Sequence, residues 1–272
     1  MNPRRRAAAC LIGVLATLLP SGCGSSSPQA TGSRICGEYD TVPLAARTGT
    51  NGYLQNNLWH EHQSGTAGHQ CSAPTAPSRP GAGETWTTSW DWSGDPQQVK
   101  SYASDVHGWN WGWKVHGSGL PVPVDGASPI TSDWTFSTAP GTTGAYDVSY
   151  DLWLHAEDAP GADSQPSGEV MLWLDRTGNH TPTGRVLGRY RLAGTSWTLY
   201  LDTGPWPVYK FVRDTDTTSV AGLDLREFTG RLVRLHLLRA DGYLTGIEAG
   251  AEVFHGAGGL TTTGYRLTLG SA

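Results

Sequence analysis

Strict alternation of apolar and polar residues is the feature that most constrains how this chain can fold. Residues 146–155 read YDVSYDLWLH, and residues 169–174 read EVMLWL. Successive side chains of a β-strand point to opposite faces, so each segment predicts a strand with one largely aliphatic face for a core. The opposite faces carry Asp, Trp, Glu and Met instead of the Thr, Ser and Lys of a typical solvent face. This composition is typical of the wall of a binding groove.

The remaining pattern favours an all-β fold. Further strands are expected at residues 84–92, 208–212, 231–239 and 265–269, and one short helix is expected at 224–228, with Asp224 as its N-terminal cap. Gly, Pro, Asn and Asp clusters separate the short strands, which predicts a two-sheet sandwich. The Trp-bearing face then belongs to the inner, concave sheet. Residues from about 35 to 270 contain no repeat and no second linker, so we expect one domain.

Composition narrows the ligand class. The formal net charge is −5, and no basic patch follows the first few residues, which argues against a nucleic-acid partner. The chain has 12 Trp but only 4 Phe. Because the indole N–H needs a partner when buried, Trp is a costly core residue, and its flat ring stacks well on the C–H face of a sugar. We expect roughly half of the Trp side chains to bind sugar and half to pack between sheets.

The N-terminus has the features of a targeting segment. Arg4–Arg6 precede an apolar run over residues 7–19 that is too short to be a stable membrane anchor. Small residues directly before Cys23 resemble a lipoprotein processing site, although Pro20 stands where Leu is usual, so plain secretion remains open. The predicted organisation is a signal peptide over 1–22, a flexible Ser/Gly-rich tether over 23–34 and a catalytic domain over 35–272.

The cysteines agree with an exported protein. Cys10 is lost with the signal segment, and Cys23 is either lipidated or near the processed end. An oxidising destination then favours a disulfide between Cys36 and Cys71.

Carboxylates on groove-facing strand positions point to glycoside hydrolysis. A retaining glycosidase places two carboxyl groups about 5–5.5 Å apart across the scissile bond. On neighbouring strands, side chains that point to the same face lie about that far apart. The catalytic carboxyl groups are therefore sought at groove-facing strand positions. Glu169 shares a face with Met171 and Trp173, and Glu252 lies in a glycine-rich segment that permits close approach of a ligand. Asp151 is a third carboxyl, able to share a proton with a nucleophile.

Several motifs together resemble glycoside hydrolase family 12, a family of compact endoglucanases and xyloglucanases. They run through most of the chain in the family's order. They are CGEYD at 36–40, NNLW at 56–59, QC at 70–71, VKSY at 99–102, YDLW at 150–153, EVMLW at 169–173 and GAEVFHG at 250–256. The resemblance implies a β-jelly-roll sandwich of two antiparallel sheets with a concave substrate cleft.

The resemblance also implies residue roles. Glu169 matches the nucleophile, Glu252 the acid/base and Asp151 the supporting carboxylate. The substrate-binding positions that follow from the match and from strand parity are Asn57, Trp59, Met171, Trp173 and Trp153. The family's pairing of its two cysteines supports a Cys36–Cys71 disulfide.

Some residues depart from the family pattern. Ala251 and Val253 replace Thr and Pro beside the acid/base, and His60 replaces Gly. Glu248 stands where a neutral residue is common. It could raise the pKa of the acid, but we expect it at a strand end in water. The alternating Trp109, Trp111 and Trp113 either widen a sugar platform or pack into the sandwich.

The predicted function is a retaining endo-β-1,4-glucanase acting on cellulose or mixed-linkage β-glucan. A xyloglucan-specific endo-β-1,4-glucanase is the alternative, and a non-catalytic carbohydrate-binding jelly roll is a remote one. No metal or cofactor is expected, because the sequence lacks the spacing of a zinc site or a phosphate loop. The expected enzyme is a monomer whose partner is its β-glucan. It is secreted, or held at the membrane only through a lipid on Cys23.

Overall fold

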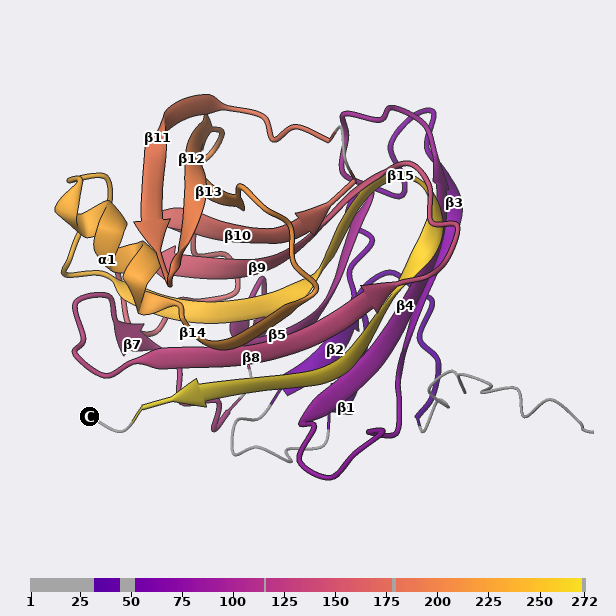
Figure 1. Cartoon of the computed structure of the whole chain (residues 1–272), viewed down its shortest axis with the longest axis horizontal. Coiled ribbons are helices and arrows are strands. Elements are labelled where there is room, and N and C mark those ends of the chain that lie inside the picture. Colours follow the sequence, from indigo (N-terminus) through magenta and orange to yellow (C-terminus); the bar gives the residue numbers. More distant parts are fainter. Residues whose placement is uncertain (1–31, 45–51, 115, 178–179, 271–272) are drawn as a thin grey trace, which may run out of the picture.

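The computed structural model describes residues 32–44, 52–114, 116–177 and 180–270 (Figure 1). The predicted signal peptide, Cys23 and most of the predicted tether lie outside the described residues. Within those ranges, no helix has the length and apolar character needed to cross a membrane.

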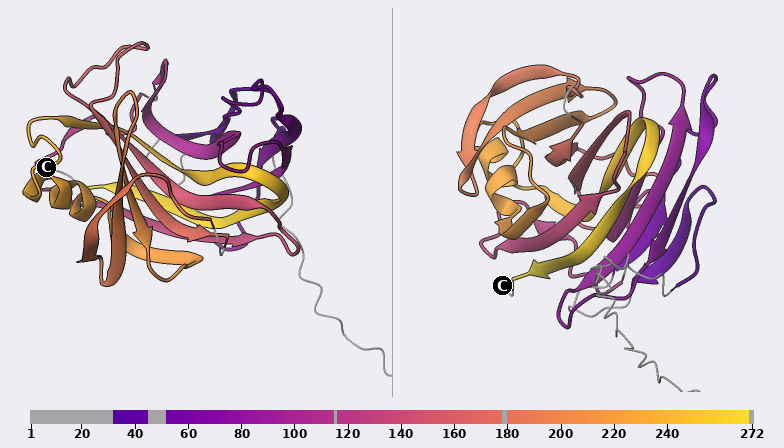
Figure 2. Two further views of the ribbon diagram at one scale, coloured as in Figure 1. Left: turned by 90° about the horizontal axis from the view of Figure 1, so that it is seen from above. Right: turned by 45° about the vertical axis from the view of Figure 1, so that its right-hand side comes forward.

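Two β-sheets pack face to face, and the larger one is strongly curved (Figures 1 and 2). Its strands follow the order β1 (Asp40–Leu44), β2 (Gly52–Asn56), β5 (Ser101–Asn110), β15 (Tyr243–Leu269), β9 (Ala145–His155), β10 (Gly168–Arg176), β13 (Pro207–Arg213), β12 (Thr195–Thr203), β11 (Arg185–Leu192). Two short strands, β6 (Trp113–Lys114) and β7 (Val122–Pro123), pair with β5 and β15. Pairing is antiparallel except between β10 and β13, which run parallel.

The smaller sheet contains β3 (Ala67–Pro74), β4 (Glu84–Ser93), the second half of β15, β8 (Ile130–Thr138) and β14 (Ser219–Asp224). The predicted strands at 84–92, 208–212 and 265–269 fall within β4, β13 and β15. The all-β, two-sheet jelly-roll sandwich predicted from the sequence is therefore confirmed.

One long strand joins the two sheets. The first half of β15 pairs with β5 and β9, and its second half pairs with β4 and β8. The change of sheet occurs at Gly256, which has a φ of 101°. A Cβ at this position would lie 2.2 Å from the backbone oxygen of Thr143. Only glycine fits both the bend and the close approach, so this residue fixes the corner of the sandwich.

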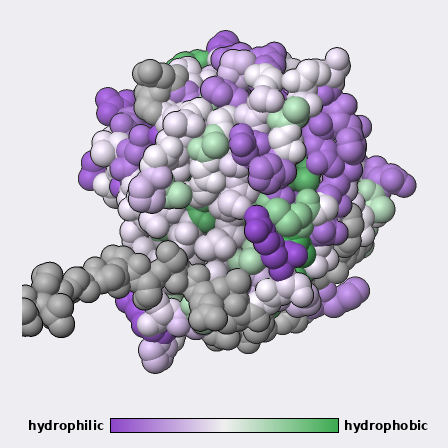
Figure 3. Space-filling model, turned by 90° about the vertical axis from the view of Figure 1, so that its right-hand side faces the viewer, coloured by the Kyte–Doolittle hydropathy of each residue, from purple (hydrophilic) through white to green (hydrophobic). Residues whose placement is uncertain are grey.

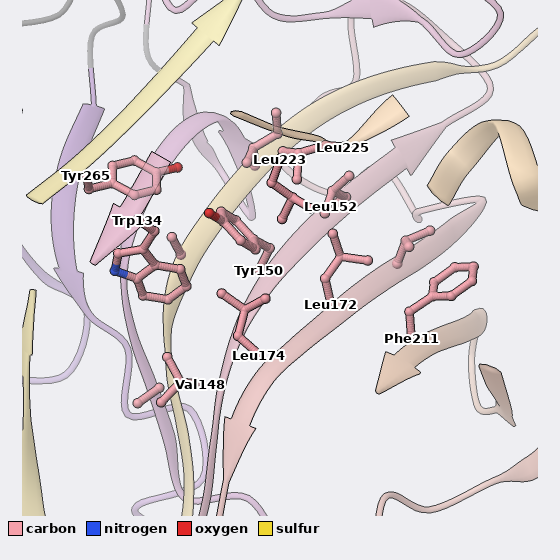
Figure 4. Packing of buried hydrophobic residues seen from close by; sticks show 14 of the residues in the cluster. Trp134, Val148, Tyr150, Leu152, Leu172, Leu174, Phe211, Leu223, Leu225 and Tyr265 are labelled. Atoms are coloured by element: carbon pink, nitrogen blue, oxygen red, sulfur yellow. The ribbon is translucent and has the colours of Figure 1, made fainter. Parts of the chain in front are cut away.

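The core lies between the sheets, against the apolar faces of β9 and β10 (Figure 4). Tyr150 on β9 packs edge-on against Trp134 of the smaller sheet, with ring centroids 5.0 Å apart. The Tyr150 hydroxyl donates to Ser132 Oγ at 2.9 Å, so the buried polar atom is satisfied. Because β9 and β10 bury one face here, their Asp, Glu and Trp side chains face the concave side, as the alternation predicts.

The prediction of a strand at residues 231–239 is wrong. The helix α1 spans Arg226–Arg234, and the chain then turns at His236, which has a φ of 56°. Phe228 and Leu232 are both fully buried, and their i, i+4 spacing places them on one face of the helix. The helix therefore begins two residues after Asp224 and runs further than predicted, and its N-cap is Leu225 instead of the predicted Asp224. Asp224 accepts the backbone N–H of Arg226 at 3.0 Å.

Cys36 and Cys71 form the predicted disulfide, with their Cα atoms 4.2 Å apart. It ties the segment before β1 to β3. On the face shown in Figure 3, hydrophobic side chains form only small, scattered patches among hydrophilic ones. The apolar side chains are instead concentrated in the core and the cleft.

Candidate active site

The concave face of the larger sheet forms a cleft of about 710 Å³. Its lining includes every residue that the sequence placed at the site: Glu169, Glu252, Asp151, Asn57, Trp59, Met171, Trp173 and Trp153. Residues more than 190 positions apart in the sequence are thus brought to one surface.

The strand order explains this convergence. Strand β9 lies between β10 and β15, with Asp151 opposite both Met171 and Glu248, and Trp153 opposite Glu169. Paired residues of neighbouring strands point to the same face, so these side chains all face the cleft. Glu169 and Glu252 do not lie on neighbouring strands. Their side chains line the same cleft on either side of β9, and the charge of Glu252 contributes to the raised pKa of Glu169.

Glu169 is almost fully buried at the cleft floor and is held by two hydrogen bonds. Trp206 Nε1 donates to Glu169 Oε2 at 2.8 Å. The second bond joins Glu169 to the carboxyl of Asp151. Burial, and next the charge of Glu169, raise the pKa of Asp151 well above its usual range, whereas burial raises the pKa of Glu169 only to about 7. Asp151 therefore stays protonated, and its hydroxyl donates a hydrogen bond to the Glu169 carboxylate.

Glu252 has a different environment on β15. Its carboxyl is partly open to the cleft and is hydrogen-bonded to the buried Asp147 of β9. Burial raises the pKa of Glu252, while the positive charge of Lys210 opposes the rise. A raised pKa keeps a carboxyl protonated, which is the state a general acid requires.

Glu248 is not in water, contrary to the expectation from the sequence. It is 1% exposed and lines the cleft. Three side chains donate to it: Ser104 Oγ to Oε2 at 2.5 Å, Asn110 Nδ2 to Oε1 at 2.6 Å, and Trp153 Nε1 to Oε1 at 2.7 Å. Burial raises its pKa to about 7 against these bonds. Glu248 can be buried because these three donors replace the hydrogen bonds to water that its carboxylate loses.

The tryptophans divide as expected between the cleft and the core. Those lining the cleft are Trp59, Trp111, Trp153, Trp173 and Trp206, and those in the core between the sheets are Trp86, Trp90, Trp92, Trp134 and Trp197. Trp59 and Trp111 are 45% and 40% exposed and present their rings to the cleft. Trp109 is buried behind Trp111, with centroids 5.1 Å apart, so the aromatic segment both extends the platform and supports it. The structure does not describe the side chain of Trp113.

Sequence reasoning missed several residues that act on the two glutamates, among them Trp206, Lys210 and Asp147. Trp206 lies between two prolines in the turn from β12 to β13, where no periodicity marks it. Lys210 lies on a strand that was predicted and pairs with Asp202 of the adjacent β12, but no local pattern links it to Glu252 on β15. Asp147 could have been found, because it shares strand parity with Asp151.

A second buried cluster lies outside the cleft. His107 Nε2 is 3.0 Å from Asp105 Oδ2 and 3.6 Å from Glu84 Oε2. Burial lowers the pKa of His107, but the charges and hydrogen bonds of Asp105 and Glu84 together outweigh burial, and the pKa rises to about 10. Burial and the Asp105 charge raise the pKa of Glu84 to about 8. The three groups are close enough to ligate a cation. As imidazolium, aspartate and protonated glutamate, however, they already balance each other's charge.

Comparisons with known proteins agree with this geometry. The model of glycosyl hydrolase family 12 matches residues 51–269. Endoglucanase S of Pectobacterium parmentieri is 33% identical over 225 residues, covering 80% of this chain and 81% of that protein. Xyloglucan-specific endo-beta-1,4-glucanase A of Aspergillus aculeatus is 34% identical over 244 residues, covering 87% and 91%. The solved family 12 xyloglucanase from Bacillus licheniformis superposes with a TM-score of 0.76 at 28% identity, covering 88% of this chain and all of that one.

Proposed function

Because the chain belongs to glycosyl hydrolase family 12, we propose that it cleaves internal β-1,4-glucosidic bonds of a β-glucan by double displacement, with retention of configuration. It is a glycoside hydrolase, and its substrate is a polysaccharide. The observation that supports the mechanism is the pair of interacting glutamates, Glu169 and Glu252, in one Trp-lined cleft.

Burial raises the pKa of both glutamates, so the first step uses the form of the cleft in which Glu252 holds a proton and Glu169 is ionised. Glu252 donates its proton to the glycosidic oxygen while the bond from that oxygen to the anomeric carbon breaks. Glu169, oriented by Trp206 and by the Asp151 hydroxyl, forms a bond to the same carbon. The result is a covalent glycosyl-enzyme and a released sugar chain.

The second step reverses these roles. The Glu252 carboxylate takes a proton from water, the water oxygen bonds to the anomeric carbon, and the bond to Glu169 breaks. Trp59 and Trp111, which are exposed in the cleft, provide stacking surfaces for sugar rings. Asn57 offers an amide for their hydroxyl groups.

Xyloglucan is the second candidate substrate. Two relatives, 34% and 32% identical to this chain, are named as xyloglucan-specific endo-beta-1,4-glucanases, and the superposed Bacillus structure is named as a xyloglucanase. A purely carbohydrate-binding role is disfavoured, because binding needs no pair of buried carboxyl groups at a cut point. We further propose that the enzyme is a secreted monomer, with a lipid on Cys23 as the alternative to free release.

Two measurements test the proposal. Initial rates are compared side by side on carboxymethylcellulose, barley β-glucan and xyloglucan, and hydrolysis of none of them would overturn the assignment as an endo-β-1,4-glucanase. Proton NMR of the first product then reports stereochemistry. We expect the β-anomer to appear first, and an initial α-anomer would rule out retention.

A further inference from the structure

Asp147 is a buried carboxyl that lies directly beside the proposed acid/base. It is opposite Glu252 in the antiparallel register of β9 and β15. The Cβ atoms of such a pair lie about 4.5–5.5 Å apart on the same face of the sheet. Asp147 is 0% exposed, whereas Glu252 reaches the cleft, and the two carboxyl groups are hydrogen-bonded to each other.

The contacts of Asp147 indicate which group holds the proton. Ser149 Oγ donates to Asp147 Oδ1 at 2.7 Å, but Asp147 Oδ2 receives no hydrogen bond from the described part of the chain. A fully buried carboxylate with a bare oxygen is strongly unfavourable, whereas a carboxylic acid can use that oxygen as a donor. Burial, followed by the charge of Glu252, raises the pKa of Asp147 well above its usual range.

We propose that Asp147 is a positioning residue that stays protonated and donates a hydrogen bond to Glu252 in both steps of the reaction. This inference rests on the proposed function of Glu252 and extends it. It gives each proposed catalytic glutamate an aspartic acid from β9, because Asp151 has the same relation to Glu169.

The proton of Asp147 is not consumed in the cycle. When Glu252 protonates the glycosidic oxygen, it becomes a carboxylate that accepts the Asp147 hydroxyl. When that carboxylate removes a proton from water, it returns to the acid, and Asp147 is unchanged. The hydrogen bond stabilises the anionic form of Glu252 and fixes its orientation toward the scissile bond.

Other groups that face Glu252 set its background charge. The groups that interact with Glu252 electrostatically are Asp147 and Asp151 on β9, Glu169 on β10, Lys210 on β13 and Tyr102 on β5. The other ionisable groups that line the same cleft are Glu248 on β15, Asp202 on β12, Tyr39 before β1 and His180 after β10. Substitution of Asp147 leaves all of the others in place, so a change in the pH profile can be assigned to this one residue.

The experiment compares Asp147→Asn and Asp147→Ala with the wild-type enzyme, in kcat/KM against pH on a soluble β-glucan. The alkaline limb of this profile reports loss of the proton from Glu252. Asn also offers a neutral donor, so we expect activity within about threefold of wild type and an unmoved limb. Ala removes the donor, so we expect the limb to move up by about one pH unit and kcat to fall about 10-fold to 100-fold.

The direction of the shift decides the inference. If Asp147 were a charged neighbour, both variants would remove a negative charge and move the limb down, which would contradict the proposal. A fall in kcat for Ala with an unmoved limb would mean a merely structural role and would also overturn it.

A carbon-13 NMR titration of the wild-type protein supplies a readout that needs neither folding of a variant nor activity. The Asp147 carboxyl should keep its protonated shift from pH 4 to pH 7, and titration below about pH 4.5 would contradict the proposal. Wild-type hydrolysis alone decides the proposed function, so its failure is distinguishable from a failure of this inference.

Discussion

Two groups of buried ionisable side chains in the described part of the chain are stabilised in different ways. The cleft group contains Asp151, Glu169, Glu248 and Glu252, with Asp147 buried beside Glu252, and the triad between the sheets contains Glu84, Asp105 and His107. In the triad, an imidazolium compensates the carboxylate charge directly. In the cleft, the hydrogen-bond donors to Glu169 and Glu248 are neutral groups such as Trp206, Trp153, Ser104 and Asn110. Retained protons and the more distant charge of Lys210 add to this compensation.

The difference separates groups that can do chemistry from groups that hold the fold. A carboxyl that is neutralised by a fixed cation has no reason to exchange a proton. A carboxyl held by neutral donors and raised to a pKa of about 7, as Glu169 and Glu248 are, lies close to the working pH of most enzymes. The pKa of Glu84 is also raised, to about 8, but the triad is buried between the sheets and does not line the cleft, so only the cleft group can exchange protons with a substrate.

The same substitution in both groups should give the largest contrast. Glu169→Gln should reduce kcat on β-glucan by about 10³-fold or more, because an amide cannot form the glycosyl-enzyme. The matched control, Glu84→Gln, should leave kcat per folded molecule within about twofold, because Glu84 is already neutral at pH 7 and lies outside the cleft. Undiminished hydrolysis by Glu169→Gln would sink the nucleophile assignment, and a large loss in Glu84→Gln would break the comparison.

Loss of Asp105 should affect stability instead of catalysis. Asp105→Asn leaves His107 as a buried cation without its main counter-charge, and the free energy of unfolding should fall by about 3 kcal/mol. Chemical denaturation measures this change, with Asp91→Asn on the exposed face of β4 as the control. A change of less than about 1 kcal/mol would show that the triad does not stabilise the fold through its charges.

Glu248→Gln should shift the pH profile without abolishing activity. Gln keeps the size of the side chain and can accept hydrogen bonds from Asn110 and Trp153, but it removes a negative charge that interacts with Glu169. Glu169 then ionises more easily, so the acidic limb of kcat/KM should move down by about one pH unit. An unmoved limb would mean that Glu248 acts only through its contacts.

Stability itself should decrease as the pH rises. Glu169 and Glu248 have folded-state pKa values of about 7, above the ordinary value of 4.5, so the folded state binds more protons than the unfolded state in this window. Their stabilising contribution is complete below pH 4.5 and is lost as the pH rises to 7. We expect Tm to fall by several degrees between pH 5 and pH 7.5, and to fall less in Glu248→Gln. A Tm that rises over this range would contradict the raised pKa values.

The local sequence pattern was sufficient to predict much of this structure. The alternation in residues 146–155 and 169–174 gave the buried and cleft-facing sides of β9 and β10 correctly, because a two-residue period admits only one assignment of faces. The segment 231–239 failed because its dense leucines fit a strand as well as a helix, and only the packing of Phe228 and Leu232 on the core decides between them.

Features that depend on tertiary contacts could not be read from the sequence. The insertion of β9 between β10 and β15 is a long-range pairing, and it gives Asp147 and Asp151 their places beside the two glutamates. The donors around Glu248 come from β5 and β9, so no local signal distinguishes it from a solvated surface glutamate. The resemblance to a family selected Glu252 over Glu248, but the reason for the burial of Glu248 emerged only from its partners.

The identity of the nucleophile is tested most directly by trapping the glycosyl-enzyme. In an activated cello-oligosaccharide, a fluorine at C2 slows both the formation and the hydrolysis of the glycosyl-enzyme. A good leaving group restores the rate of formation only, so the intermediate accumulates. Peptide mass spectrometry should then find one fluorinated oligosaccharide attached to Glu169 and none in the Glu169→Gln variant. A label on another residue, or turnover of natural substrate with inversion and no label, would contradict the assignment of Glu169 as the nucleophile of a retaining enzyme.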